Sequence, residues 1–339
     1  MATSPGKGTH SMKTAFLLAA LLILSPCAAA GSGPDQLAVK EGTIREQQPA
    51  APSPEATPPA PVIRKKIRHP DAQSPAPTAP PTAQVPKAPA AQPPAPPASQ
   101  APAPSAKERL VAAYKNQTPK EWGERVAGVK TQLDTSEKVI ALTFDACGGP
   151  RGSRVDTVLI EFLRKEKIPA TLFVSGSWID ANPAVFKTLA ADPLFEIENH
   201  GLAHKPCSVN GNKAYGIKGT ASVGELVDEI EKNGRKIEAV TGGKPKFYRP
   251  GTAYCDEVAV KVAGELGYEV VNYSILGDAG ATRPKEKIRE AMLKAGPGAI
   301  VILHMNQPRS QTAAGLKEAI PLLRQKGFRF VKLSEYPLR

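Results

Sequence analysis

Hydrophobic and polar residues follow two alternating patterns from Lys138 onward. Runs of consecutive β-prone apolar residues, typical of strands buried on both faces of a parallel sheet, are followed by segments with apolar residues every three or four positions, typical of amphipathic helices. The runs predict strands at 139–145, 170–174, 194–199, 246–249, 268–274, 299–303 and 328–333. The periodic segments predict helices at 153–165, 183–190, 223–240, 256–266, 284–294 and 312–325.

The order of these elements indicates the fold class. About seven strands, each but the last followed by a helix, predict an α/β protein with a parallel sheet. The simplest architecture is a parallel (β/α) barrel that is incompletely closed, and a doubly wound open sheet is the alternative. Two helices are expected before the first strand, at 106–114 and 119–133, the second because Trp122, Val126 and Val129 fall at helical spacing.

Composition separates the 339-residue chain into a part that can fold and a part that cannot. Residues 31–105 consist mainly of Pro and Ala, so they cannot bury enough apolar surface to offset the conformational entropy lost on folding. We expect this segment to be a disordered linker, partly in the polyproline II conformation. The folded domain is accordingly placed at residues 106–339.

Residues 1–30 have the features of a secretory signal. Lys13 precedes an apolar run at 15–24, and the small residues up to Ala30 form an Ala-x-Ala cleavage site. Residues 24–27 also resemble a lipoprotein box, although Pro26 is atypical there, so cleavage, lipidation of Cys27 and an uncleaved N-terminal membrane anchor are alternatives. Each alternative predicts an exported protein, periplasmic or extracellular.

The net charge of +12 bears on the expected partners. Nucleic acid is not predicted, because no recognition motif accompanies the charge and aromatic residues make up only 5% of the chain. For an exported chain, anionic envelope polymers and lipid surfaces are the expected partners. The basic cluster Val62–Arg68 could contact such a surface through the linker or remain a solvated run of charge.

Candidate chemistry gathers where the predicted strands end. The side chains at or after these ends are Asp145, His200, His204, Arg249, Asp278 and His304. Because the carboxyl ends of parallel strands meet at one rim, we expect these groups to share one site. The structural alternatives are a helix cap for Asp145, an ion pair between Arg249 and Asp278, and a hydrogen-bonded core position for His304.

Histidine placement suggests a metal. Three of the five histidines lie in the predicted domain, and His200 and His204 are four residues apart, a spacing that suits two imidazole ligands of one divalent ion. Two structural histidines are the alternative. The loop at 200–220 that follows is long enough to be functional, and its Tyr215 is a candidate for the wall of a substrate groove.

Cysteine usage leaves three options. Cys147, Cys207 and Cys255 lie in the predicted domain, so in an exported protein one of them stays free, binds metal or pairs between chains.

These residues together resemble the polysaccharide deacetylases of the NodB-homology type, carbohydrate esterase family 4. The similarity covers about residues 138–333, and Thr143-Phe144-Asp145, His200-x-x-x-His204, Arg249-Pro250, the region around Asp278, and Leu303-His304 look like the five family motifs in order. The resemblance implies a distorted (β/α) barrel and metal-dependent removal of acetyl groups from N-acetylated or sometimes O-acetylated sugars. Zn2+ is the expected ion, although imidazole and carboxylate ligands also accept cobalt, nickel or manganese.

The resemblance also implies roles for single residues. Asp145 would be the general base, His304 the general acid, and His200 and His204 the metal ligands. Arg249 and Asp278 would orient Asp145.

One position departs from the family pattern. The family usually has a second aspartate, a metal ligand, directly after the first, and here that position is Ala146. Asp145 itself, Glu198 two residues before His200, or Cys147 as a thiolate could fill in. The structural alternatives are a solvated or salt-bridged Glu198 and a packed or disulfide-bonded Cys147.

The expected function is therefore deacetylation of an envelope or extracellular polysaccharide such as peptidoglycan, a chitin-like polymer or poly-N-acetylglucosamine. A catalytically silent glycan-binding module without the full metal site is the alternative from another class, and an amidohydrolase for small amides is a third.

Overall fold

A computed structural model of the chain describes residues 104–339, and its main sheet is built around β2, Val139–Ala146. The sheet has the order β10-β11-β2-β3-β4-β7-β9, with β12 paired to one end of β2, and all its pairings are parallel. The other strands of this sheet are β3 Ala170–Val174, β4 Phe195–Asn199, β7 Phe247–Tyr248, β9 Glu269–Val270, β10 Ile275–Leu276, β11 Ala299–His304 and β12 Arg329–Val331.

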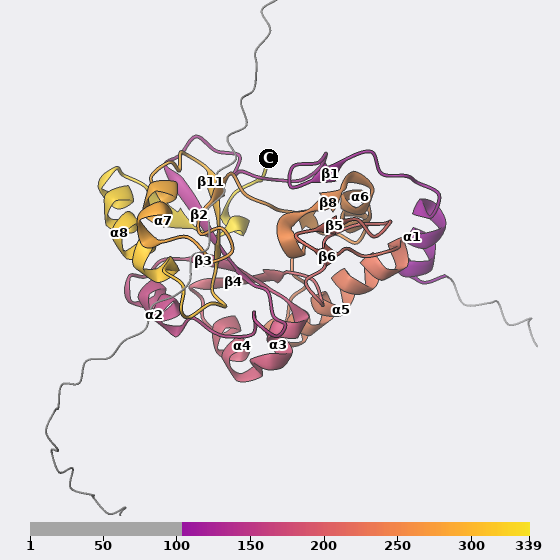
Figure 1. The fold of residues 1–339 in the computed structure, drawn as a ribbon, viewed down its shortest axis with the longest axis horizontal. Helices are drawn as coiled ribbons and strands as arrows, with labels where there is room; N and C mark the ends of the chain where they lie inside the picture. Colours follow the sequence, from indigo (N-terminus) through magenta and orange to yellow (C-terminus); the bar gives the residue numbers. More distant parts are fainter. Residues whose placement is uncertain (1–103) are drawn as a thin grey trace, which may run out of the picture. The chain divides into compact units, whose positions relative to one another are not determined.

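The helices lie around the outside of this curled sheet (Figure 1). They are α1 Ala106–Tyr114, α2 Thr157–Lys165, α3 Gly176–Ala181, α4 Pro183–Ala190, α5 Val223–Thr241, α6 Glu257–Glu265, α7 Lys285–Met292 and α8 Thr312–Gln325. The strands of this path follow one another around the sheet in chain order, β12 lies off the path beside the start of β2, and no pairing within residues 104–339 joins β9 to β10. The α/β class and the incompletely closed barrel are thus confirmed, and the doubly wound alternative is wrong because the strand order does not reverse.

Alternation along β2 separates two packed layers. Leu142, Phe144 and Ala146 face the helices and join the largest apolar cluster, whereas Val139 and Ala141 face the inside of the curled sheet. Every residue of β2 is buried, so the near-continuous apolar run has the physical cause expected for a central parallel strand. Asp145 is the polar exception, and it lies on the inner side, where the site forms.

The predicted helix at 119–133 is wrong. Its residues form β1, Trp122–Gly123, which pairs antiparallel with β8, Cys255–Asp256, and then an irregular segment in which Lys130 pairs with Val271. Gly128 has a φ of +91°, which a helix cannot contain. Its backbone finds tertiary partners instead, and these outweigh the helical spacing of three apolar residues.

Other boundaries shift by a few residues. The helix expected from residue 153 begins at Thr157, because the Asp156 side chain caps it by accepting from the Leu159 N–H at 3.0 Å. The strand expected at 268–274 is regular only over Glu269–Val270. The polar loop at 200–220 contains an antiparallel hairpin of β5, Lys213–Ala214, and β6, Ile217–Lys218, and α3 is an additional helix.

The predicted signal at 1–30 and most of the linker at 31–105, with its cluster Val62–Arg68, lie outside the described residues. In residues 104–339, no helix is long and apolar enough to cross a bilayer.

Asp256 ties the loop before the hairpin to α6 and provides a stability test. Its Oδ1 accepts from the Ala259 N–H at 2.7 Å and its Oδ2 from the Val209 N–H at 2.8 Å, all in a buried environment. Replacing Asp256 by Ala should lower the free energy of unfolding by about 2–4 kcal/mol, because it removes a helix cap and leaves two N–H donors without acceptors. Urea denaturation checks this. Asp256→Asn is the control: it keeps one acceptor and should lose less than half as much, and an equal loss would contradict the explanation.

Candidate active site

The carboxyl ends of the central strands converge on one cavity of about 740 Å³. Asp145 is the second-last residue of β2 and His304 the last residue of β11, and the two are register partners on neighbouring strands. His200 follows β4 and Arg249 follows β7, which pair at Asn199 and Tyr248. The predicted rim of polar groups is therefore one place in the structure, as parallel strand order requires.

Asp145 is held by a buried arginine. Arg249 Nη1 donates to Asp145 Oδ1 at 2.8 Å, and both side chains are almost fully buried. Arg249 uses most of its other N–H groups as well: Nη1 also bonds the Thr143 hydroxyl, while Nε and Nη2 reach the carbonyl oxygens of Val271 and Asn272 at 3.0 Å. A guanidinium held by these bonds is a fixed counter-charge that orients Asp145.

Asp278 contacts His304, whereas the sequence resemblance implied a contact with Asp145. His304 Nδ1 donates to Asp278 Oδ1 at 2.8 Å, and Asp278 Oδ2 accepts from the His304 backbone N–H at 2.7 Å and the Thr312 hydroxyl at 3.0 Å. The difference arises because Asp278 follows β10, which neighbours β11 and not β2. Asp278 therefore fixes the tautomer and orientation of the His304 ring, whose other nitrogen is left for the cavity.

His200 is prepared as a ligand by a backbone contact. Its Nδ1 donates to the Arg249 carbonyl oxygen at 2.8 Å, which leaves Nε2 as the ring nitrogen that faces the site. Nε2 lies 3.6 Å from Asp145 Oδ2 and 3.9 Å from Cys147 Sγ. The His204 ring lies edge-on, 4.8 Å away between centroids.

The loop carrying His204 has an unusual backbone. His204 has a φ of +58°, and a Cβ on Gly251 would meet the His204 carbonyl oxygen at 2.1 Å, so only glycine fits there. The buried Glu229 of α5 accepts from the N–H groups of Ala203 and Lys205 at 2.9 and 3.1 Å. Glu229 thereby supports the His204 conformation from behind, a role that nothing in its helical sequence context signals.

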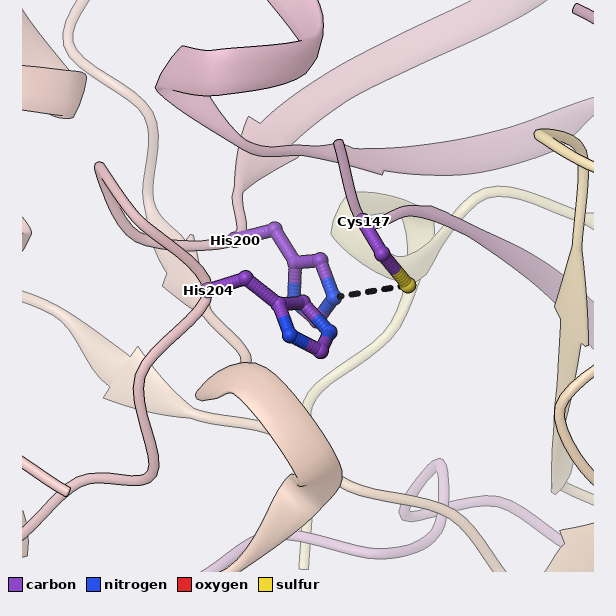
Figure 2. Close-up of side chains that lie close together, drawn as sticks. All are labelled: Cys147, His200 and His204. Carbon is purple, nitrogen blue, oxygen red and sulfur yellow. Dashed lines mark hydrogen bonds between the residues drawn. The ribbon is translucent and has the colours of Figure 1, made fainter. Parts of the chain in front are cut away.

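Cys147 and Glu198 differ sharply in position. Cys147, His200 and His204 each offer one donor atom, and these atoms all lie within 4.8 Å of one another; in the described part of the chain no other group of three such side chains is as close. Figure 2 shows the three side chains pointing toward one another. Glu198, in contrast, does not join this group, because its carboxylate faces β7 and accepts from the Phe247 N–H at 2.6 Å.

The acid and base candidates have opposite electrostatics. Burial alone would raise the pKa of Asp145, but Arg249, His200 and His304 outweigh it and hold the pKa below its usual value. Burial alone would lower the pKa of His304, but the Asp278 carboxylate raises it well above the usual value. At neutral pH the site therefore holds an ionised carboxylate and a protonated imidazole.

Two further groups complete this picture. Burial would raise the pKa of the Cys147 thiol, but His204 and then His200 bring that pKa well below its usual range. Glu198 shows the reverse, since burial raises its pKa to about 9 and it is neutral at pH 7. A neutral, hydrogen-bonded Glu198 is a structural group.

The cysteines form no disulfide among residues 104–339. Cys207 and Cys255 are buried and pair through their backbones, and Cys147 is free and lines the cavity. The disulfide alternative for Cys147 is therefore absent from this structure.

The cavity rim is aromatic on one side. Tyr215, at the tip of the β5–β6 hairpin, is 75% exposed and contacts Tyr254 edge-on at 5.5 Å. Glu124 accepts from the hydroxyls of Tyr215 and Tyr273 at 3.3 and 2.7 Å, and these three residues line the cavity, whereas Tyr254 does not. Exposed aromatic faces beside a polar site are suited to stacking on sugar rings.

A curled parallel sheet with a buried carboxylate and an imidazole at neighbouring strand ends, both lining one cavity, is typical of an enzyme site. A sequence profile described as polysaccharide deacetylase matches residues 132–271. A peptidoglycan-N-acetylglucosamine deacetylase of Bacillus cereus is 32% identical over 211 residues, which are 61% of this chain and 92% of that protein. The chain belongs to the polysaccharide deacetylase family.

Other relatives share the fold and less of the sequence. The peptidoglycan-N-acetylglucosamine deacetylase PgdA of Listeria monocytogenes is 27% identical over 59% of this chain and 39% of its own length. A solved CE4 family pseudoenzyme from Bacillus anthracis is 25% identical, with a TM-score of 0.50 over 61% of this chain and 67% of that one. The family thus includes deacetylases and a member described as a pseudoenzyme.

Gly148 and Gly149 provide a matched test of the turn that positions Cys147. Their φ angles are +74° and +75°, but an added Cβ would meet Ser177 Oγ at 2.2 Å at Gly148 and nothing within 4 Å at Gly149. Gly149→Ala should cost about 1–2 kcal/mol of unfolding free energy through backbone strain alone. Gly148→Ala should cost about 1–3 kcal/mol more through overpacking. Equal midpoints in urea denaturation would show that the turn does not press on α3.

Proposed function

We propose that this chain hydrolyses the acetamido group of N-acetylated sugars in an envelope polysaccharide, in a metal-dependent reaction. The observation that carries the proposal is the register pairing of Asp145 and His304 at one end of a cavity whose wall also holds His204, with His200 directly behind. The naming of relatives as peptidoglycan-N-acetylglucosamine deacetylases supports this substrate class. An envelope substrate also agrees with the export predicted from residues 1–30.

The donor atoms fit a divalent metal, which we take to be zinc. Nε2 of His200 and the ring of His204 are nitrogen donors beside an ionised Asp145. When bound, such a metal supplies Lewis-acid polarisation of a carbonyl and a lower pKa for water. We further infer that Ala146 stands where other members have a second aspartate, and its side chain packs in the apolar core.

The side chains of this chain would divide the proton transfers between them. Asp145, held by Arg249, takes a proton from the water whose oxygen attacks the acetyl carbon. His304, protonated and oriented by Asp278, gives a proton to the sugar nitrogen as the carbon–nitrogen bond breaks. The products are acetate and the free amino sugar, and both carboxyl and imidazole return to their starting states by exchange with water.

Two residues that line the cavity have polar atoms without a hydrogen-bond partner. Thr252 Oγ1 and Asn306 Oδ1 are buried without a hydrogen-bond partner in residues 104–339, and both residues line the cavity. Groups of this kind are satisfied by the hydroxyl or amide of a bound sugar. Together with Tyr215 and Tyr273 they match the mixed polar and apolar character of a pyranose ring.

The proposal is tested on the full chain by metal analysis and acetate release from N-acetylglucosamine oligomers. We expect about one equivalent of metal, acetate release, and loss of both with His200→Ala. Asp145→Asn should retain the metal and lose about 100- to 10,000-fold in kcat, because only the general base is removed. Circular dichroism of each variant controls for unfolding, since Arg249 loses its buried partner in Asp145→Asn.

The alternative function is glycan binding without turnover, which the similarity to a CE4 pseudoenzyme favours. It predicts retention of the oligomers by a chain that releases no acetate at any metal loading. That result would overturn the proposed hydrolysis.

The contact between Asp278 and His304 predicts a pH effect. Asp278 raises the pKa of His304, so the protonated form persists to higher pH than for an ordinary histidine. The Asp278→Asn variant should lower that pKa, and the alkaline limb of the kcat profile should move to lower pH, with the acidic limb set by Asp145 unchanged. A profile that only drops in height would mean that Asp278 acts through packing. Thr312→Val, which removes a neutral bond to the same carboxylate, is the matched control and should shift the limb much less.

A further inference from the structure

The Cys147 thiol lies where a third metal ligand would have to be. Its Sγ is 3.9 Å from His200 Nε2, and the donor atoms of Cys147, His200 and His204 all lie within 4.8 Å of one another (Figure 2). In a tetrahedral zinc site with Zn–S of about 2.3 Å and Zn–N of about 2.0 Å, neighbouring donors are roughly 3.3–3.6 Å apart. The three donor atoms would have to move closer together by side-chain rotation when a metal binds.

The strand places residue 147, and not residue 146, toward the two histidines. Successive side chains of a strand point to opposite faces, so Cys147 shares the side of Asp145 while Ala146 packs with Leu142 and Phe144. The Cys147 backbone is fixed as well, because Ser175 Oγ donates to its carbonyl oxygen at 2.8 Å. The turn at Gly148 then packs directly on the start of α3.

The neighbouring carboxylates are committed elsewhere. Asp145 gives Oδ1 to Arg249 and has only Oδ2, 3.6 Å from His200 Nε2, toward the histidines, and Glu198 bonds the Phe247 N–H. Neither carboxylate belongs to the close group of three donors, in which a Cys147 thiolate would be the anionic member beside two imidazoles.

We propose that Cys147 is the third protein ligand of the metal, in a Cys–His–His set with His200 and His204 that leaves a fourth position open for water or substrate. This inference rests on the metal site of the proposed function and changes the ligand set and metal preference of that site. A thiolate is a soft ligand, so the site should prefer zinc to manganese or magnesium more strongly than a site with a carboxylate in this place.

The test uses the full chain and does not depend on activity. Zinc X-ray absorption should show one sulfur scatterer at about 2.3 Å, and cobalt loading should produce a thiolate-to-metal charge-transfer band. Cys147→Ser should abolish both signals. It should also weaken zinc binding by more than roughly 10- to 100-fold, because that is the loss expected when a residue that only hydrogen-bonds to a ligand is removed. Cys207→Ala is the matched control, since Cys207 is buried in a different cluster, and it should retain both signals.

Two further measurements keep the test independent of variant folding. In the unmodified chain, one equivalent of zinc should protect Cys147 from alkylation, as located by peptide mass spectrometry. Cys147→Asp should restore metal binding without the sulfur signal and lower the ratio of zinc to manganese affinity.

The outcomes separate this inference from the proposed function. Acetate release by a zinc-loaded chain with a sulfur-free shell, or with Cys147 still alkylated, would overturn the ligand assignment and leave deacetylation standing. A zinc shell that contains sulfur, in a chain that releases no acetate, would support the ligand assignment and overturn deacetylation. Absence of bound zinc at one equivalent would overturn both.

Discussion

The buried ion pair between Asp145 and Arg249 is the interaction on which the site depends. It joins the end of β2 to the end of β7 across the inside of the curled sheet, where an unpaired charge would be strongly unfavourable. Arg249 can occupy this position because its other donors bond Thr143 and two carbonyl oxygens after β9. Its own carbonyl in turn accepts from His200. One residue therefore orients both the carboxylate and the nearest imidazole, and through them the geometry of the cavity floor.

The site separates its two titrating pairs by strand order. Asp145 has a cationic partner and stays ionised, while His304 has an anionic partner in Asp278 and stays protonated. The pairs lie side by side because β2 and β11 are neighbours in register. Partners that push the two pKa values apart in this way keep a carboxylate ionised and an imidazole protonated in one pocket at neutral pH, the states that the proposed base and acid require. The sheet thus positions the titrating groups, and the helices mainly cover its outer face.

The loops after the strands bring backbone segments into close contact with one another around the proposed metal-binding side chains. His204 adopts a left-handed conformation against Gly251, and Glu229 holds the N–H groups on either side of it from a buried position. On the other side, Gly148 brings the backbone after Cys147 against α3. These contacts place a sulfur and two imidazoles within reach of one ion, although they come from segments more than fifty residues apart in the chain.

The sequence by itself determined the α/β class, the order of the strands and the set of polar groups at their ends, because buried apolar runs, helical periodicity and strand-end positions are local properties that the chain order preserves. It also indicated the family, since five short motifs occur in the right order. Only the tertiary structure decided which group meets which. The contact of Asp278 with His304 follows from the position of β10 beside β11. Cys147 is a better candidate metal ligand than Glu198 because the Glu198 carboxylate turns away to the Phe247 N–H. The false helix at 119–133 has the same cause: its backbone finds partners in β8 and at Val271, far along the chain, and no local pattern reports such long-range contacts.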